Sequence, residues 1–318
     1  MNEVLSIIGP VFGLAAIGYI SARLGWVSEQ MASGLALFVF NFAIPIFLVR
    51  VFANTDMPDT LPLGLWASFY LPQLTVYGIG MLAGRRFGRD FMGQTITGFG
   101  CAFGNTVLMG TAIVLLAFGD AGAVPLFLII SIHGLLLFTL TTVLLEFGRN
   151  QGASMRTLPL QIGKSLVTNP ILIGIVTGLT LNVTEIQLPS VLDQIAAYMQ
   201  DAVTPCAIFS LGVSLTRYGF VGRLGQTAFV TAMKLLVMPA GVWLFAQFVF
   251  ELPPLWTMVA VLTAAQPCGV NLYLFAQRYR TAPALATSSV FLSTVISMAT
   301  LSLLIYFVRV YGGVLPTG

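Results

Sequence analysis

Two short stretches combine polar amide side chains with helix-breaking residues inside otherwise apolar sequence. Residues 98–106 read GFGCAFGNT, with three glycines ahead of Asn105, and residues 266–271 read QPCGVN. Glycine and proline weaken a helix, and side-chain amides can satisfy exposed backbone groups or hydrogen-bond a solute. We therefore predict two interrupted helices that meet at their breaks, where opposed half-helix N-termini favour an anionic ligand. The alternative is close packing of intact helices through small residues, as the spacing of Gly100 and Gly104 also permits.

Three ionisable residues fall inside apolar segments and are candidates for ion coupling, namely His133, Asp201 and Lys234. Histidine ordinarily titrates near neutral pH, so His133 can share in proton coupling, touch a carboxylate, or serve only as a hydrogen-bonded packing residue. Lys234 can neutralise Asp201, meet a substrate carboxylate as a point charge, or reach toward the membrane interface. We predict that Asp201 takes and gives a proton, because an unpaired charge at depth is costly. Asp201→Asn should then abolish proton-driven uptake and spare substrate exchange.

The elements that must position these residues are apolar helices long enough to cross a membrane. Of the 318 residues, 57% are hydrophobic and 8% are charged, and the mean hydropathy is +0.94. A soluble domain cannot hide this much apolar surface, whereas about 20 apolar residues suffice to cross the hydrocarbon of a bilayer. The predicted spans are ten, at residues 4–21, 32–52, 63–84, 92–117, 122–146, 164–183, 188–214, 225–249, 255–277 and 283–309. The chain is therefore predicted to be an all-α polytopic membrane protein.

The basic residues predict how these spans are oriented. Most of the 14 Lys and Arg residues occur in every second loop, and basic loops resist translocation across the membrane. They are Arg23, Arg85, Arg86, Arg89, Arg149, Arg156, Lys164, Arg217, Arg223, Arg278 and Arg280. These loops are predicted to be cytoplasmic, with both termini on the non-cytoplasmic side of the cell inner (plasma) membrane. The first span has no basic segment before it and is expected to be retained rather than removed as a signal peptide.

The chain repeats itself when its first part is shifted by 160 positions. The aligned pairs are Pro10 and Pro170, Gly18 and Gly178, and Pro45 and Pro205. Each half has five predicted spans, an odd number, so the second half must enter the membrane from the opposite face. The sequence thus predicts an inverted repeat, which in secondary transporters places the binding site between the halves near the midplane.

The same shift aligns Asn41 with Asp201, each four residues before its proline. A helical proline has no N–H to bond the carbonyl four residues earlier, and a carbonyl freed inside a bilayer needs a partner. Both positions therefore combine a freed carbonyl with a polar side chain. We include Asn41 in the candidate binding site, and two ordinary proline kinks patched by polar residues are the alternative.

The sequence argues against enzymatic, metal and nucleic-acid chemistry. Cys101, Cys206 and Cys268 fall inside spans without a CxxC pair, and one histidine gives too few metal ligands. Asp193 and Asp201 lie on one predicted helix, so they cannot face each other as an aspartyl protease requires. Basic residues scattered over many loops indicate topology rather than nucleic-acid binding. We predict no catalytic residue, no metal site, no cofactor and no nucleic-acid partner.

Several motifs spread from the second to the ninth span share a recognisable pattern. They are NFAIP at 41–45, GNTVLMG at 104–110, TNPIL at 168–172 with Gly178, TPCAIFSLG at 204–212, and the Pro267 break followed by FAQRY at 275–279. Through them the chain resembles the auxin efflux carrier family of membrane transporters, which includes the plant PIN proteins and bacterial carriers of small carboxylates. Family members often place a proline shortly after the Asn-Thr stretch of the fourth span. Thr111 and Ala112 stand there instead, so the break in this span must rest on glycines and Asn105.

The resemblance implies ten transmembrane helices in two inverted five-helix repeats, with helices 4 and 9 broken and crossing, as in the bile-acid sodium symporter-like fold. It implies that helices 1, 2, 6 and 7 form a scaffold domain, and that helices 3–5 and 8–10 form a transport domain. The transport domain would move by elevator-type alternating access. The repeats are predicted at residues 1–146 and 164–318, joined by a cytoplasmic loop at 147–163.

Asn105 matches the family residue associated with substrate binding at the crossing, and its neighbours follow from position. The residues assigned to the substrate site are Gly104, Asn105, Thr106, Gln266, Pro267, Asn271, His133 and Asn41, with Asp201 and Lys234 assigned to proton or ion coupling.

The predicted function is secondary active transport of a small organic anion, coupled to protons or driven by the membrane potential. The anion is expected to be a mono- or dicarboxylate, and an auxin-like weak acid also fits. Sodium coupling stays open, because Asn105, Gln266 and freed carbonyls are acceptable Na⁺ ligands. A channel or a non-transporting ligand sensor on the same fold is the further alternative. The expected partners are the anion, membrane lipids and a second copy of the chain bound through the scaffold helices.

Overall fold

The computed structural model describes residues 2–54, 62–149, 167–219 and 224–312. In these residues the regular structure is helical apart from one isolated β-bridge. Most of the predicted connecting loop at 147–163, and the basic residues Arg156, Lys164 and Arg223 used for the orientation, lie outside the described residues.

The helices of the first half follow the predicted spans closely. They are α1 (Asn2–Arg23), α2 (Glu29–Phe38), the π-helix η1 (Val39–Ala43), α3 (Ile44–Asn54), α4 (Leu63–Arg86), α5 (Phe91–Ala102), the π-helix η2 (Thr106–Gly110), α6 (Thr111–Phe118), the 3₁₀ helix η3 (Gly119–Gly122) and α7 (Ala123–Gly148). The predicted span at 32–52 is one continuous run from α2 through η1 to α3. The π-turn η1 ends two residues before Pro45, which has no N–H to donate to the helix. Within this turn the N–H of Ile44 donates to the carbonyl of Val39, five residues earlier, as in a π-helix.

The second half of the described chain has a comparable series of helices. They are α9 (Pro170–Val183), α10 (Ser190–Ser214), the 3₁₀ helix η4 (Leu215–Arg217), α11 (Leu224–Ala232), the π-helix η5 (Met233–Val237), α12 (Met238–Leu244), the π-helix η6 (Phe245–Val249), α13 (Pro254–Ala264), α14 (Asn271–Arg278) and α15 (Pro283–Gly312). The TNP motif at 168–170 has a local structural reason. Asn169 caps α9 by accepting a hydrogen bond from the N–H of Ile171 at 3.0 Å, and Pro170 occupies the first turn, where no N–H is needed.

Several of these helices are long and apolar enough to cross a bilayer. Within the described residues, four stretches meet that criterion, at Glu29–Asn54, Thr106–Gly148, Leu224–Val249 and Pro283–Phe307. The stretch Thr106–Gly148 has 43 residues and bends at η3, where Gly119 has a φ of 59°. Large apolar side chains also face outward, including Leu82 at 69% and Val183 at 82% exposure. The chain is therefore a multi-pass helical membrane protein, and its division into ten spans remains a prediction.

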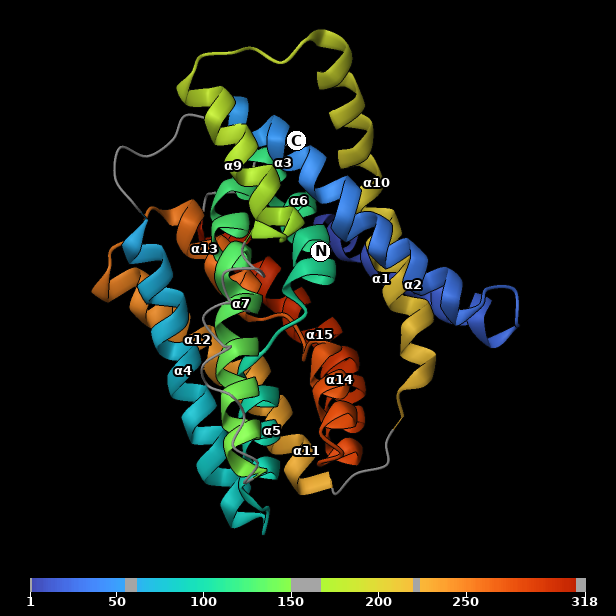
Figure 1. Cartoon of the computed structure of the whole chain (residues 1–318), viewed down its shortest axis with the longest axis vertical. Helices are drawn as coiled ribbons and strands as arrows, with labels where there is room; N and C mark the ends of the chain where they lie inside the picture. The colour runs from blue at the N-terminus through green and yellow to red at the C-terminus, as the bar shows by residue number, and fades with distance from the viewer. Residues whose placement is uncertain (1, 55–61, 150–166, 220–223, 313–318) are drawn as a thin grey trace.

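The helices separate into two packed groups. α1 packs along α10 and α3 packs along α9, whereas α4 packs along α5, and α11 contacts α15. Figure 1 shows α3, α9 and α10 in the upper part of the molecule and α4, α5, α11 and α14 in the lower part. α7, α13 and α15 each contribute side chains to both hydrophobic cores, so these three helices connect the groups.

Two close helix contacts in the first group occur at positions related by the sequence shift. A Cβ added to Gly18 of α1 would collide with the carbonyl oxygen of Phe209 in α10. A Cβ added to Gly178 of α9 would lie 2.8 Å from the carbonyl oxygen of Val49 in α3. Gly18 and Gly178 are 160 positions apart, and so are Val49 and Phe209. The same glycine-to-carbonyl contact is therefore made twice, each time between the two halves of the sequence.

Candidate functional site

The centre of the molecule contains two helix interruptions that pair with each other. α5 ends at Ala102 and η2 begins at Thr106, while α13 ends at Ala264 and α14 begins at Asn271. Between them, Gly104 and Cys268 form an antiparallel β-bridge. The N–H of Asn105 donates to the carbonyl of Pro267 at 2.8 Å, and the N–H of Gly269 donates to the carbonyl of Phe103 at 3.1 Å. These bonds satisfy backbone groups that the interruptions free. We call residues 103–106 and 265–271 the crossing.

Polar side chains line this crossing without enough partners. Asn105, Thr106 and Gln266 are 7%, 1% and 0% exposed. Gln266 donates through Nε2 to the carbonyl of Leu262 at 2.9 Å, but its Oε1 and the Thr106 Oγ1 have no hydrogen-bond partner in the described part of the chain. A Cβ on Gly110 would lie 3.4 Å from Gln266 Cγ and 3.7 Å from Thr106 Cβ, so these side chains share one small region. Buried polar atoms normally have partners, so these two oxygens leave hydrogen-bonding capacity free at the crossing.

Lys234 brings a basic group to the same place. It is 1% exposed on η5, and its Nζ donates to the carbonyl of Ala264, the last residue of α13, at 2.5 Å. A Cβ on Gly104 would lie 3.2 Å from Nζ, so the amine reaches the crossing. None of the ion pairs among the described residues includes Lys234. A buried ammonium without a counter-ion is costly.

His133 packs against Phe103, at the interruption between α5 and η2. Its ring stacks on that of Phe103 with centroids 5.0 Å apart, and Nδ1 lies 3.5 Å from Nε2 of Gln73. The same Nε2 donates to the carbonyl of Ala102 at 3.1 Å, which caps the end of α5. His133 Nε2 has no partner among the described residues. The structure thus places His133 against Phe103, beside the crossing, and Gln73 becomes a member of the site.

Sequence reasoning did not select Gln73 or Ser293. Ser293 of α15 accepts a hydrogen bond from the N–H of Cys268 at 3.0 Å, which ties α15 to the second interruption. Both side chains are fully buried polar groups within apolar helices. Gln73 also follows Pro72 directly within the predicted span 63–84. A polar amide next to a proline inside an apolar span was therefore the sequence pattern that could have identified it.

The structure does not bring all predicted site residues to the crossing. Gly104, Asn105, Thr106, Gln266 and Pro267 lie at it, and Asn271 starts α14 with a half-buried side chain. Asn41 and Asp201 are exposed on η1 and α10, so neither side chain lines the buried crossing in this conformation. No ion pair joins Lys234 to Asp201 in the described residues. The roles of Asn41 in binding and of Asp201 in coupling stay predictions.

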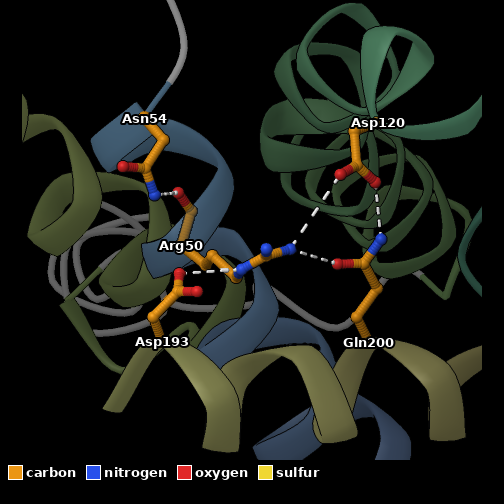
Figure 2. A network of polar contacts seen from close by, with 5 residues as sticks. All are labelled: Arg50, Asn54, Asp120, Asp193 and Gln200. Atoms are coloured by element: carbon orange, nitrogen blue, oxygen red, sulfur yellow. Dashed lines mark hydrogen bonds and ion pairs between the residues drawn. The ribbon is translucent and has the colours of Figure 1, made fainter. Parts of the chain in front are cut away.

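A second polar cluster joins three helical segments away from the crossing. Figure 2 shows Arg50 of α3 between Asp193 and Gln200 of α10, with Asp120 of η3 facing it. Arg50 Nε donates to Asp193 Oδ1 at 2.8 Å, and its Nη1 donates to Gln200 Oε1 at 3.0 Å and lies 4.0 Å from Asp120 Oδ2. Gln200 Nε2 in turn donates to Asp120 Oδ1 at 2.5 Å. A cavity of about 480 Å³ adjoins Arg50, Asp120 and Asp193. The cluster connects η3 to the group that contains α3 and α10.

Comparison with known proteins covers almost the whole chain. The family model described as membrane transport protein matches residues 4–305. A protein of Rhizobium meliloti provisionally named a malonate transporter is 25% identical over 320 residues, covering 99% of this chain and 98% of its own length. Auxin efflux carrier component 8 of Arabidopsis thaliana is 24% identical, covering 96% of this chain and 97% of its own. An uncharacterized transporter of Methanothermobacter thermautotrophicus is 26% identical, covering 92% and 94%.

Proposed function

Since the chain belongs to the membrane transport protein family, with auxin efflux carriers among its relatives, we propose that it is a secondary active transporter of a small organic anion. The anion class is a mono- or dicarboxylate, and malonate is the first compound to test because a relative that aligns over 98% of its length is named for malonate transport. The observation that supports this proposal most directly is the buried Lys234 amine at the crossing, which has no ion-pair partner among the described residues.

The crossing can bind a carboxylate through several donors. Asn105 offers a buried side-chain amide, and Thr106 offers a hydroxyl without a partner among the described residues. Lys234 supplies a positive charge beside Gly104. Hydrogen bonds to a charged group are stronger than neutral ones, so a carboxylate gains more from this set of donors than a neutral solute. The second carboxylate of a dicarboxylate would then be recognised by Asn271 or by the start of α14.

The proposed fold is an inverted repeat with crossed, interrupted helices. The paired glycine contacts of Gly18 with Phe209 and of Gly178 with Val49 support it, because an inverted repeat requires each contact between the halves to occur twice. We further propose that the group with α1, α2, α3, α9 and α10 is the scaffold and that the remaining helices carry the crossing in an elevator movement. An apolar cavity of about 370 Å³ lies between α1 and α10 on one side and η2 and α15 on the other. This loosely filled contact supports movement of the proposed transport domain along the proposed scaffold.

Uptake into liposomes tests the transport proposal. Purified protein reconstituted in liposomes should take up radiolabelled malonate with saturation, and unlabelled malonate inside should accelerate uptake by counterflow. Lys234→Met should lose most uptake. Thr227→Val is the matched control, because Thr227 is a buried, unpartnered polar residue on α11, the helix that leads into η5. Absence of binding and uptake for malonate and for indole-3-acetate, a monocarboxylate, would refute the proposal.

Two alternatives give different results in the same assay. A channel would show uptake without counterflow, and a ligand sensor would bind the anion without uptake. Sodium coupling is the alternative to proton coupling, and it would use the unpartnered oxygens of Gln266 and Thr106, which are hard ligands that suit Na⁺. An inward Na⁺ gradient would then accelerate uptake.

Labelling of cysteines introduced near Asn2 and near Arg85 from either side of the inner membrane tests the proposed non-cytoplasmic position of the termini. Cross-linking through α1 tests the proposed homodimer.

A further inference from the structure

The carbonyl that Lys234 contacts is one that the interruption frees. Ala264 is the last residue of α13, so its carbonyl has no continuing helix to bond. Lys234 Nζ donates to it at 2.5 Å and stands beside Gly104 of the other interrupted helix. Carbonyl oxygens at a helix break are the ligands that a coupling cation such as Na⁺ would use. The amine of Lys234 already holds this position.

Within the described ranges of the chain, no permanently negative side chain pairs with Lys234. The titratable groups that face it are the thiols of Cys101 on α5 and Cys268 in the crossing, and the imidazole of His133 on α7. No carboxylate of a described residue forms an ion pair with it. The positive charge of a protonated Lys234 therefore has no counter-charge until an anion binds. Equally, the negative charge of a bound anion has no counter-charge unless Lys234 is protonated.

We infer that Lys234 is the coupling cation of this carrier, so that one proton and one carboxylate bind together at the crossing and no Na⁺ takes part. The step is an acid–base equilibrium without redox change: the neutral amine takes a proton from water, and the ammonium formed pairs with the carboxylate oxygen. Release reverses both steps and returns the empty site to a neutral state. A monocarboxylate then crosses as a neutral pair with its proton, and a dianion crosses with one net negative charge.

This inference rests on the proposed function, and it moves proton coupling from Asp201 to Lys234. Lys234 lies at the crossing, whereas Asp201 is exposed on α10. Because the charge of the amine and the charge of the anion depend on each other, proton binding and anion binding are thermodynamically linked.

The direct test counts protons in the wild-type protein. Calorimetric titration of the purified protein with malonate, at a series of pH values from 7 to 10 and in buffers of different ionisation enthalpy, should show proton uptake that rises with pH toward one proton per bound anion. Binding should be the same with Na⁺ or with choline as the salt cation. Anion binding without proton uptake, or binding that requires Na⁺, would overturn the inference and leave the transport proposal intact. Absence of binding and uptake would instead refute the transport proposal.

Two variants locate the coupling group. Lys234→Arg keeps a permanent charge, so it should bind malonate with about zero protons taken up and should exchange malonate without acceleration by a proton gradient. Asp201→Asn should keep the proton count and the acceleration of the wild type. If Asp201→Asn loses both and Lys234→Arg keeps both, the coupling group is Asp201 and the inference is wrong. Should Lys234→Arg fail to fold, the wild-type proton count and Asp201→Asn still decide.

Discussion

The paired glycine contacts allow a quantitative test of the inverted repeat. In the structure, a Cβ on Gly178 would lie 2.8 Å from the carbonyl oxygen of Val49 and 2.8 Å from Cβ of Phe52. Gly18 makes the equivalent contact with Phe209. We expect Gly178→Ala and Gly18→Ala to destabilise the protein by similar amounts, because equivalent helix pairs, α9 with α3 and α1 with α10, are forced apart.

The expected magnitude follows from the size of the clash. A separation of 2.8 Å is about 0.7 Å inside the roughly 3.5 Å optimum for non-bonded atoms, and a backbone oxygen cannot rotate away. Overpacking of this kind typically costs about 1–3 kcal/mol, while alanine in place of glycine gains at most about 1 kcal/mol of helix propensity. The net loss should be about 1–2 kcal/mol, which for a chain of 318 residues corresponds to a fall in Tm of roughly 1.5–3 °C.

Thermal unfolding of the purified variants in one detergent measures this loss. Gly13→Ala is the matched control on α1, because a Cβ there would meet nothing within 4 Å, and its Tm should equal or exceed that of the wild type. The double variant should lose about the sum of the single losses, since the two contacts share no residue. A drop for only one of Gly18→Ala and Gly178→Ala would contradict the symmetry, and no drop for either would refute the packing argument itself.

Three further changes test other parts of the molecule. Gly104→Ala places a Cβ 3.1 Å from Cε of Lys234, so it should displace the amine and raise the KM for malonate, with little change in Tm, and an unchanged KM would count against an anion site there. Gln73→Leu removes the donor to the Ala102 carbonyl, and the unsatisfied carbonyl should cost about 1–3 kcal/mol, seen as a lower Tm; a wild-type Tm would show that the carbonyl finds another donor. Arg50→Ala should change Tm by little, because partly exposed ion pairs contribute about 0–1 kcal/mol, and a large loss would show that the cluster in Figure 2 is a main anchor of η3.

Local sequence determined the helices, the family and the place of the interruptions. Apolar length predicted the spans because a bilayer offers no water to exposed backbone groups, and the helix ends agree with those spans to within a few residues wherever the structure describes them. Gly98, Gly100 and Gly104 weaken the helix in which they lie, and Pro267 ends the other, so the breaks could be predicted from composition alone. The family was predicted from the same motifs and is confirmed by the match over residues 4–305.

The identity of the side chains that meet at the crossing was decided only by tertiary structure. Asp201 and Lys234 are both ionisable residues inside apolar sequence, yet Asp201 is exposed and Lys234 is buried beside Gly104. Sequence position along a span sets depth, but rotation of each helix about its axis depends on packing against helices that are distant in the chain. Gln73 caps α5 and Arg50 joins α3 to η3 and α10 for the same reason. Their partners lie 29 to 150 positions away, where no local pattern reports them.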